Sequence, residues 1–176
     1  MRIISGKHKG RKIRAPFVEE IRPTTDFAKT GLFNVLNNHI DFEGIKVLDL
    51  FSGLGAVAFE FASRGAAFVD AVDTHPQSVN FIRQFAEQIN LPVNVYSSDA
   101  VQFLKKVHQK YDVIFADPPY EMSDVLDEVL KIIEDRKILA DGGIIILEHE
   151  RNKSFAGHER LFDERKYGKV HFSFFR

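Results

Sequence analysis

The sequence predicts an α/β fold built on a doubly wound, mostly parallel sheet, and three observations support this. Short apolar runs of strand-forming residues alternate with segments whose apolar residues recur at helical spacing. A glycine turn follows the first such strand, which is typical of parallel sheets that bind a ligand at their carboxyl edge. Beyond residue 159 no helix intervenes and Val170–Phe174 alternates, so we expect a C-terminal antiparallel hairpin at the sheet edge.

Length and composition set the class of protein. The chain has 176 residues and 44% hydrophobic content, which predicts one soluble domain spanning 1–176. It contains no apolar run of transmembrane length and no charged-then-apolar leader, so we expect a cytoplasmic protein without membrane contact. The absence of cysteine excludes disulfides and thiolate metal sites, and the seven histidines are scattered, so we expect no metal.

Each helix and strand of this fold follows from a local signal. Pro23, Thr24 and Thr25 indicate a helix start, Pro76 opens another helix, and Asp141–Gly143 is expected to be a turn. We expect helices over 25–38, 56–62, 76–89, directly after Asp99, and over 125–133. We expect parallel strands over 46–50, 68–72, 93–96, 111–116 and 144–147.

The amino-terminal stretch is strongly basic. Residues 1–14 hold no acid and carry +6, so the rest of the chain carries −7 to reach the net charge of −1. The cations are Arg2, Lys7, Lys9, Arg11, Lys12 and Arg14. Glycines within Ile3–Ile13 predict a small β-hairpin, part of an extension over 1–20 that precedes a core over 21–176. Such a hairpin must dock on the body or on a ligand, and its cations suit a phosphate backbone. A solvated charged ribbon is the alternative.

Several strand ends carry an aspartate. Asp49 and Asp73 end the first and second strands, and Asp99 follows the third, where it caps a helix, contacts a ligand, or does both. Gly53 permits the tight turn and Gly55 lets a ligand approach the backbone, while Asp73, 20 residues past Gly53, suits the two hydroxyls of a ribose.

Asp49 limits what the ligand can be. A dinucleotide would place a diphosphate beside this carboxylate, which would repel it. No Gly-x-x-x-x-Gly-Lys-Ser/Thr motif is present, which argues against a nucleoside triphosphate. S-adenosylmethionine has a ribose, an adenine and two cationic groups but no phosphate, and it therefore fits the pattern.

The stretch Asp117-Pro118-Pro119-Tyr120 follows the fourth strand. The prolines end the strand because they cannot donate to a sheet ladder. A carboxylate, proline carbonyls and an aromatic ring then face the expected cleft, where they suit an exocyclic amine on a flat base. The alternative is a proline turn in which Tyr120 only packs.

These motifs together resemble a known family. Asp49–Gly55, Asp73, Asp99 and Asp117–Tyr120 resemble S-adenosylmethionine-dependent enzymes that methylate exocyclic amines of bases. The opening Met1–Gly6 with Gly10-Arg11-Lys12, the segment Arg22-Pro23-Thr24-Thr25-Asp26 and the tail at Tyr167-Gly168 narrow the resemblance to bacterial small-subunit ribosomal RNA guanine-N2 methyltransferases. The chain departs from that pattern at Phe27-Ala28-Lys29-Thr30 and at Leu54.

The resemblance implies a Rossmann-like methyltransferase domain that transfers a methyl group from S-adenosylmethionine to N2 of a guanine in 16S ribosomal RNA. The implied cofactor-binding residues are Asp49, Phe51, Ser52, Gly53, Gly55, Asp73, Thr74, Asp99 and Ala100. The implied catalytic residues are Asp117, Pro118, Pro119 and Tyr120. The expected RNA contacts are Lys7, Lys9, Arg11, Lys12, Arg14 and Arg22, the last of which could also be an ordinary surface cation.

The sequence leaves alternatives open for the form of the RNA substrate and for the class of activity. The RNA substrate is either naked or within an assembling small ribosomal subunit, and we expect a monomer. A methyltransferase acting on adenine or another base of RNA or DNA stays open, as do an NAD-dependent oxidoreductase and an RNA-binding module without turnover.

Overall fold

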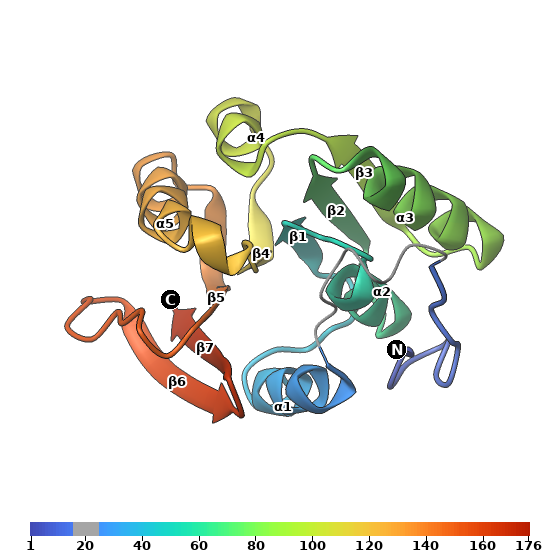
Figure 1. The fold of residues 1–176 in the computed structure, drawn as a ribbon, viewed down its shortest axis with the longest axis horizontal. Helices are drawn as coiled ribbons and strands as arrows, with labels where there is room; N and C mark the ends of the chain where they lie inside the picture. The colour runs from blue at the N-terminus through green and yellow to red at the C-terminus, as the bar shows by residue number, and fades with distance from the viewer. Residues whose placement is uncertain (16–24) are drawn as a thin grey trace.

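The computed structural model describes residues 1–15 and 25–176, and a seven-stranded sheet runs through its centre (Figure 1). The strands are β1 (Lys46–Leu50), β2 (Phe68–Asp73), β3 (Val93–Ser97), β4 (Tyr111–Ala116), β5 (Leu139–His149), β6 (Leu161–Tyr167) and β7 (Val170–Phe175). The helices are α1 (Asp26–Leu36), α2 (Ala56–Ser63), α3 (Pro76–Gln88), α4 (Ala100–Lys106) and α5 (Val125–Asp135), with a 3₁₀ turn over Tyr120–Met122.

The strand order is β3-β2-β1-β4-β5-β7-β6. The first five strands pair in parallel, whereas β7 pairs antiparallel with both β5 and β6. The chain moves outward from β1 to β3 and then returns to the other side of β1 with β4. The order therefore reverses between β1 and β4, which is where open α/β sheets bind ligands. The predicted doubly wound sheet with its C-terminal antiparallel hairpin is confirmed.

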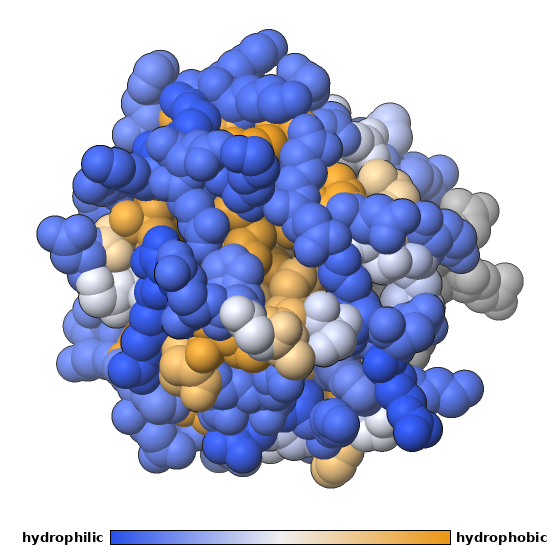
Figure 2. Space-filling view, turned by 90° about the vertical axis from the view of Figure 1, so that its left-hand side faces the viewer, coloured by the Kyte–Doolittle hydropathy of each residue, from blue (hydrophilic) through white to orange (hydrophobic). Residues whose placement is uncertain are grey.

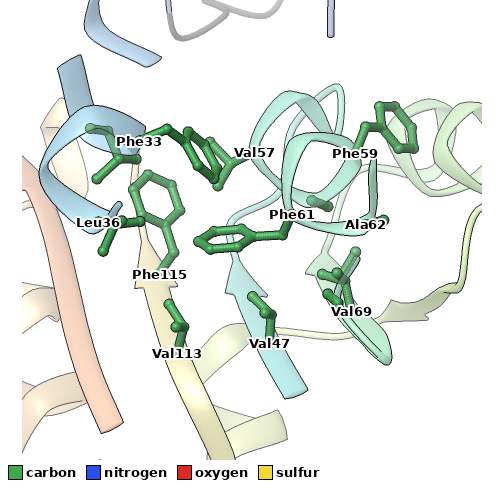
Figure 3. Close-up of a cluster of buried hydrophobic side chains, with 14 of the residues drawn as sticks. Phe33, Leu36, Val47, Val57, Phe59, Phe61, Ala62, Val69, Val113 and Phe115 are labelled. Carbon is green, nitrogen blue, oxygen red and sulfur yellow. The ribbon is translucent and has the colours of Figure 1, made fainter. Parts of the chain in front are cut away.

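Helices cover both faces of the sheet, and each face has its own hydrophobic core. One core joins α1, α2 and α3 to the sheet, and the other joins α4 and α5 to the opposite face. Figure 3 shows Phe33 of α1 and Phe61 of α2 lying over Val47 and Val113. The face drawn in Figure 2 is mostly hydrophilic, although hydrophobic side chains gather at its centre. No helix in the described part of the chain is long and apolar enough to cross a membrane.

The amino-terminal arm, residues 1–15, docks on the body. It turns back on itself through a single antiparallel bridge between Arg2 and Lys12, so the expected hairpin is reduced to one bridge. Ile3 and Ile13 are buried in the core on the α1 and α2 face. Gly6 lies so close to α2 that a Cβ there would come within 1.9 Å of the Ser63 carbonyl oxygen. The arm is therefore part of the folded body. Of the two expected docking partners, the body and a ligand, the structure shows the body.

A buried ion pair anchors this arm. Glu60 of α2 accepts hydrogen bonds from the backbone N–H groups of Ile4 (2.8 Å) and Ser5 (2.9 Å). The Lys29 ammonium of α1 lies 3.4 Å from the Glu60 carboxylate and donates to the Arg2 carbonyl oxygen. Both side chains are fully buried, and burial lowers the pKa of Lys29 although Glu60 opposes that shift. The pair joins α1, α2 and the arm in one network.

Two predicted boundaries need correction or fall outside the described residues. The turn expected at Asp141–Gly143 is wrong, because these residues lie inside β5. Tyr111 of β4 pairs with Leu139, and Val113, two residues later, pairs with Ile144, which is five residues after Leu139. The extra residues of β5 form a wide irregularity in the strand. Thr25 caps α1 by accepting from the Ala28 N–H, whereas Pro23, Thr24 and the expected division between residues 20 and 21 lie outside the described residues.

Candidate active site

A cavity of about 550 Å³ opens at the carboxyl edge of the sheet, where the strand order reverses. Apart from Gly55, every residue predicted to bind the cofactor or to act in catalysis lines it. These residues are Asp49, Phe51, Ser52, Gly53, Asp73, Thr74, Asp99, Ala100, Asp117, Pro118, Pro119 and Tyr120. A second hollow of about 460 Å³, between α3 and β3, contains none of the predicted site residues. The sequence-based candidates thus meet in one place.

The loop between β1 and α2 forms one wall of the cavity. Its backbone takes positive φ angles at Phe51 (62°), Gly53 (54°) and Gly55 (75°). Ser52 holds the loop in place, because its N–H donates to the Val72 carbonyl oxygen at 3.0 Å and its hydroxyl donates to the Asp49 carbonyl oxygen at 2.7 Å. The left-handed conformation of Phe51 is unusual for a non-glycine residue, and such strain is common beside ligand sites.

Gly55 serves packing rather than the wall of the cavity. It precedes α2 in a left-handed conformation, and a Cβ there would lie 2.9 Å from the Phe59 ring and 3.0 Å from Ile82. Both neighbours belong to the hydrophobic core beneath the loop. The second glycine of the turn is therefore needed to bring α2 and α3 together.

Asp73 connects the glycine loop to the second strand. Its Oδ2 accepts from the Gly53 N–H at 2.7 Å, and its Oδ1 accepts from the His75 N–H at 2.8 Å. Each carboxylate oxygen can accept a further hydrogen bond, and Asp73 lines the cavity. The carboxylate can therefore shape the loop and still accept from two neighbouring hydroxyl groups of a ligand.

Asp49 is the most buried acid of the site, with 1% of its surface exposed. Its Oδ2 accepts from the Ala58 N–H at 3.1 Å, whereas its Oδ1 has no hydrogen-bond partner among the described residues. Burial raises the pKa of this carboxyl well above its usual value, and the nearby Asp117 raises it further. A buried carboxylate oxygen in this state calls for a cationic hydrogen-bond donor and would repel a phosphate.

Asp99 and Asp117 lie on opposite sides of the reversal point. Asp99 caps α4, since its Oδ1 accepts from the Gln102 N–H at 2.9 Å, and it also lines the cavity. The Asp117 N–H donates to the Leu50 carbonyl oxygen at 3.4 Å, which continues the pairing of β4 with β1. The chain then turns sharply, with the Met122 N–H donating to the Pro119 carbonyl oxygen at 2.8 Å. These bonds hold the proline segment in place along the wall of the cavity.

Comparison with known proteins places the chain in a family. The whole chain, residues 1–176, matches the family described as Conserved hypothetical protein 95. It is 34% identical over 151 residues to the ribosomal RNA small subunit methyltransferase D of Escherichia coli (strain K12), covering 85% of this chain and 75% of that protein. The chain belongs to this family.

Other members agree over nearly the full length. The chain is 31% identical over 183 residues to the ribosomal RNA small subunit methyltransferase D of Buchnera aphidicola subsp. Baizongia pistaciae, covering 99% of this chain and 91% of that protein. A solved structure of a putative methyltransferase from Escherichia coli superposes with a TM-score of 0.87 at 28% identity, covering 99% and 96% of the two chains. The likeness to that solved structure therefore covers nearly the whole chain.

The expected RNA-contacting cations lie apart from the cavity. Those of the arm are exposed and none of them lines the cavity: Lys7, Lys9, Arg11, Lys12 and Arg14. Arg22 lies outside the described residues. Met1 and Thr25 nevertheless line the cavity, so the body-facing end of the arm and the start of α1 border it. Within the described ranges, no cluster of His, Asp and Glu side chains could hold a metal ion.

Sequence reasoning missed several lining residues. Glu148 is the most important, because it adds an acid beside the predicted ones. The half-buried His75 and the buried Ser78 add polar groups at the start of α3. The signal for Glu148 was its place at the end of a buried strand, the same signal that singled out Asp117. Its neighbours His149 and Glu150 share that signal but do not line the cavity.

Proposed function

We propose that this protein transfers a methyl group from S-adenosylmethionine to the exocyclic N2 amine of a guanine in 16S ribosomal RNA. One observation carries the choice of cofactor: the buried Asp49 has an Oδ1 without a hydrogen-bond partner among the described residues, beside the glycine loop. An ammonium group satisfies that oxygen, whereas the diphosphate of a dinucleotide would be repelled by it. Family membership supports both the methyl transfer and a ribosomal RNA substrate.

Each acid of the site would contact a different group of the cofactor. Asp73 would accept from the two ribose hydroxyls while it holds Gly53 in place. Asp49 would accept from the ammonium group, and Asp99, on the far side of the glycine loop, would accept from the adenine amine. When bound, the cofactor supplies an activated methyl group on a sulfonium. The protein's task is then to bring an amine in line with that methyl group.

The segment Asp117–Tyr120 performs that task. The Asp117 carboxylate and the Pro118 carbonyl oxygen would accept from the two amine hydrogens, which leaves the nitrogen lone pair directed toward the cofactor. Positive charge develops on the amine as the bond forms, and these two acceptors stabilise it. Tyr120 would stack on the base, which must leave its helix to enter the cavity. No strong base is needed, since the amine becomes far more acidic after methylation.

The arm supplies the affinity for RNA. Its exposed cations would contact phosphates, while its buried residues fix it to the rim of the cavity. Exposed Phe27, in the first turn of α1, lies edge-on to Tyr167 with ring centroids 5.8 Å apart, close to the lining residue Thr25. Aromatic side chains in such places stack with unpaired bases, which agrees with an RNA substrate.

The decisive experiment is methyl transfer from labelled S-adenosylmethionine to unmodified 16S ribosomal RNA, offered naked and in small-subunit particles. We expect N2-methylguanosine as the product in nucleoside mass spectrometry. N6-methyladenosine would instead support the adenine alternative. No incorporation into either substrate would overturn the proposal. Calorimetric titration with S-adenosylmethionine and with NAD tests the cofactor separately, because an oxidoreductase would bind only the latter.

A further inference from the structure

A row of acidic side chains crosses the carboxyl edge of the sheet. In spatial order across β2, β1, β4 and β5 the row is Asp73, Asp49, Asp117 and Glu148. All line the same cavity. The first three have partners in the proposed reaction, namely the ribose, the ammonium group and the reacting amine. Glu148 comes next after the amine and has no assigned role.

The register places Glu148 on the same face as Asp117. Phe115 of β4 pairs with Ile146 of β5, and both belong to the core on the α1 to α3 face. Side chains alternate along a strand, so the residues two positions further on, Asp117 and Glu148, face the same way. Parallel neighbours lie about 4.8 Å apart, so the two carboxylates can reach adjacent atoms of one ligand.

Glu148 is held rigidly rather than presented on a loop. It lies within β5, where its backbone pairs with Phe172 of β7, and only 5% of its surface is exposed. Phe172 packs against Phe115 with ring centroids 6.4 Å apart, so the strands on both sides of Glu148 are fixed by the core. A buried acid on a rigid strand, bordering a cavity, is well placed for recognition of a ligand group.

We propose that Glu148 selects guanine by accepting a hydrogen bond from its N1–H while Asp117 holds the N2 amine. This assignment rests on the proposed function and names the group that makes the same site specific for one base. In guanine, N1 and N2 are bonded to the same carbon, and both donate. In adenine, the ring nitrogen beside the amine is an acceptor. An ionised carboxylate only accepts, so it pairs with guanine and repels the lone pair of adenine.

The chemistry makes the discrimination large. A flipped base is read by hydrogen bonds along its pairing edge. A site built to pair with a particular N–H rejects an analogue lacking it by as much as about 10⁴-fold, because the buried acceptor is left facing another acceptor. The aminopurine analogue 2-aminopurine tests this directly, since it keeps the exocyclic amine at position 2 but has an unprotonated N1.

The experiment compares an RNA carrying guanine at the methylated position with the same RNA carrying 2-aminopurine there. For the wild-type protein we expect kcat/KM to be at least about 100-fold higher on guanine. In Glu148→Gln the ratio should fall at least about tenfold, because the amide can donate to the unprotonated N1. Glu150→Gln, the same change two residues further along, serves as the control and should keep the wild-type ratio.

Two outcomes would overturn this role of Glu148. One is a wild-type protein that methylates both RNAs equally well, a result that needs no variant to fold. The other is a folded Glu148→Gln, with unchanged S-adenosylmethionine affinity, that keeps the wild-type ratio, as a purely structural glutamate would. In both cases guanine is still methylated, so the proposed function stands. Failure to methylate guanine in any RNA would overturn the proposed function itself, and the role of Glu148 with it.

Discussion

The backbone N–H of Gly53 donates a 2.7 Å hydrogen bond to Oδ2 of Asp73, which ties the glycine loop after β1 to the end of β2. The two residues are 20 positions apart in the sequence, and a parallel sheet brings them together because β1 and β2 are neighbours. The acid that is expected to hold the ribose therefore also shapes the glycine loop that lines the same cavity.

Asp73→Ala should weaken S-adenosylmethionine binding by about 1–3 kcal/mol, because donors in the loop and in the ligand lose a charged acceptor. Calorimetric titration measures this. Asp141→Ala, an exposed aspartate in the irregular start of β5, is the matched control and should bind normally. An unchanged dissociation constant in folded Asp73→Ala would remove this residue from the cofactor site.

Asp117→Ala should abolish most turnover and leave cofactor affinity nearly intact, since its proposed contact is with the target amine. Single-turnover methylation of RNA at saturating cofactor gives the rate, and titration gives the affinity. The reverse pattern, with lost cofactor binding and a normal rate at saturation, would show that Asp117 belongs to the cofactor half of the cavity.

Asp49→Asn should raise the stability of the folded protein while it weakens cofactor binding. Burial raises the pKa of Asp49 in the folded, unliganded protein above its value in the unfolded chain, which is near 4. The folded state then binds the proton more tightly, so this residue lowers the free energy of unfolding as pH rises between those two pKa values. The asparagine variant should lose that pH dependence, be more stable than wild type at pH 7, and bind S-adenosylmethionine at least about tenfold more weakly.

Denaturant titrations of both proteins from pH 4 to pH 8 give the stability curves, and calorimetry gives the affinity. A variant that is less stable than wild type at pH 7 would contradict the account of Asp49 as a buried acid kept for its ligand.

Neutralising Lys9, Arg11 and Lys12 together by glutamine should flatten the salt dependence of RNA affinity. Each lost phosphate contact on a single strand removes about 0.7 from the log–log slope, so the shift should be about 2. Substitution is a better test than deletion of the arm, because Ile3 and Ile13 are part of the core. The matched control neutralises three exposed lysines elsewhere, Lys106, Lys110 and Lys137. Equal slopes for the two triple variants would exclude the arm as the RNA-binding surface.

Glu60→Ala should cost about 3–5 kcal/mol of unfolding free energy, because it leaves the buried Lys29 ammonium without its partner. Chemical denaturation measures the loss. Glu87→Ala, an exposed glutamate on α3, should change stability by no more than about 0.5 kcal/mol. A loss below 1 kcal/mol for Glu60→Ala would mean that the arm holds its place without this network.

The sequence predicted the sheet and most of the cavity because both depend on local patterns. Apolar runs define the strands, and Asp49, Asp73 and Asp117 stand where those runs end. Glu148 needed the structure: the register of β5 against β4 turns His149 to the opposite face, and Glu150 lies beyond the end of β5, so Glu148 alone of these three lines the cavity. Glu60 gave no signal, because its partners on the arm are 55 and 56 residues away. The Gly142-Gly143 pair resembled a turn, although it lies inside β5, between Leu139, which pairs with Tyr111, and Ile144, which pairs with Val113.

Helix α2 connects the cavity to the amino-terminal arm, although it is only eight residues long. Near its start, the Ala58 N–H donates to Asp49, and near its end Glu60 and Ser63 hold the arm. One inserted residue would turn everything beyond it by about 100°. Glu60 and Ser63 would then point away from the arm, while the Ala58 N–H still donated to Asp49. An insertion or deletion between Ala58 and Glu60 would therefore uncouple the arm from the cavity. We expect members of the family to keep the length of this helix even where they differ in its sequence.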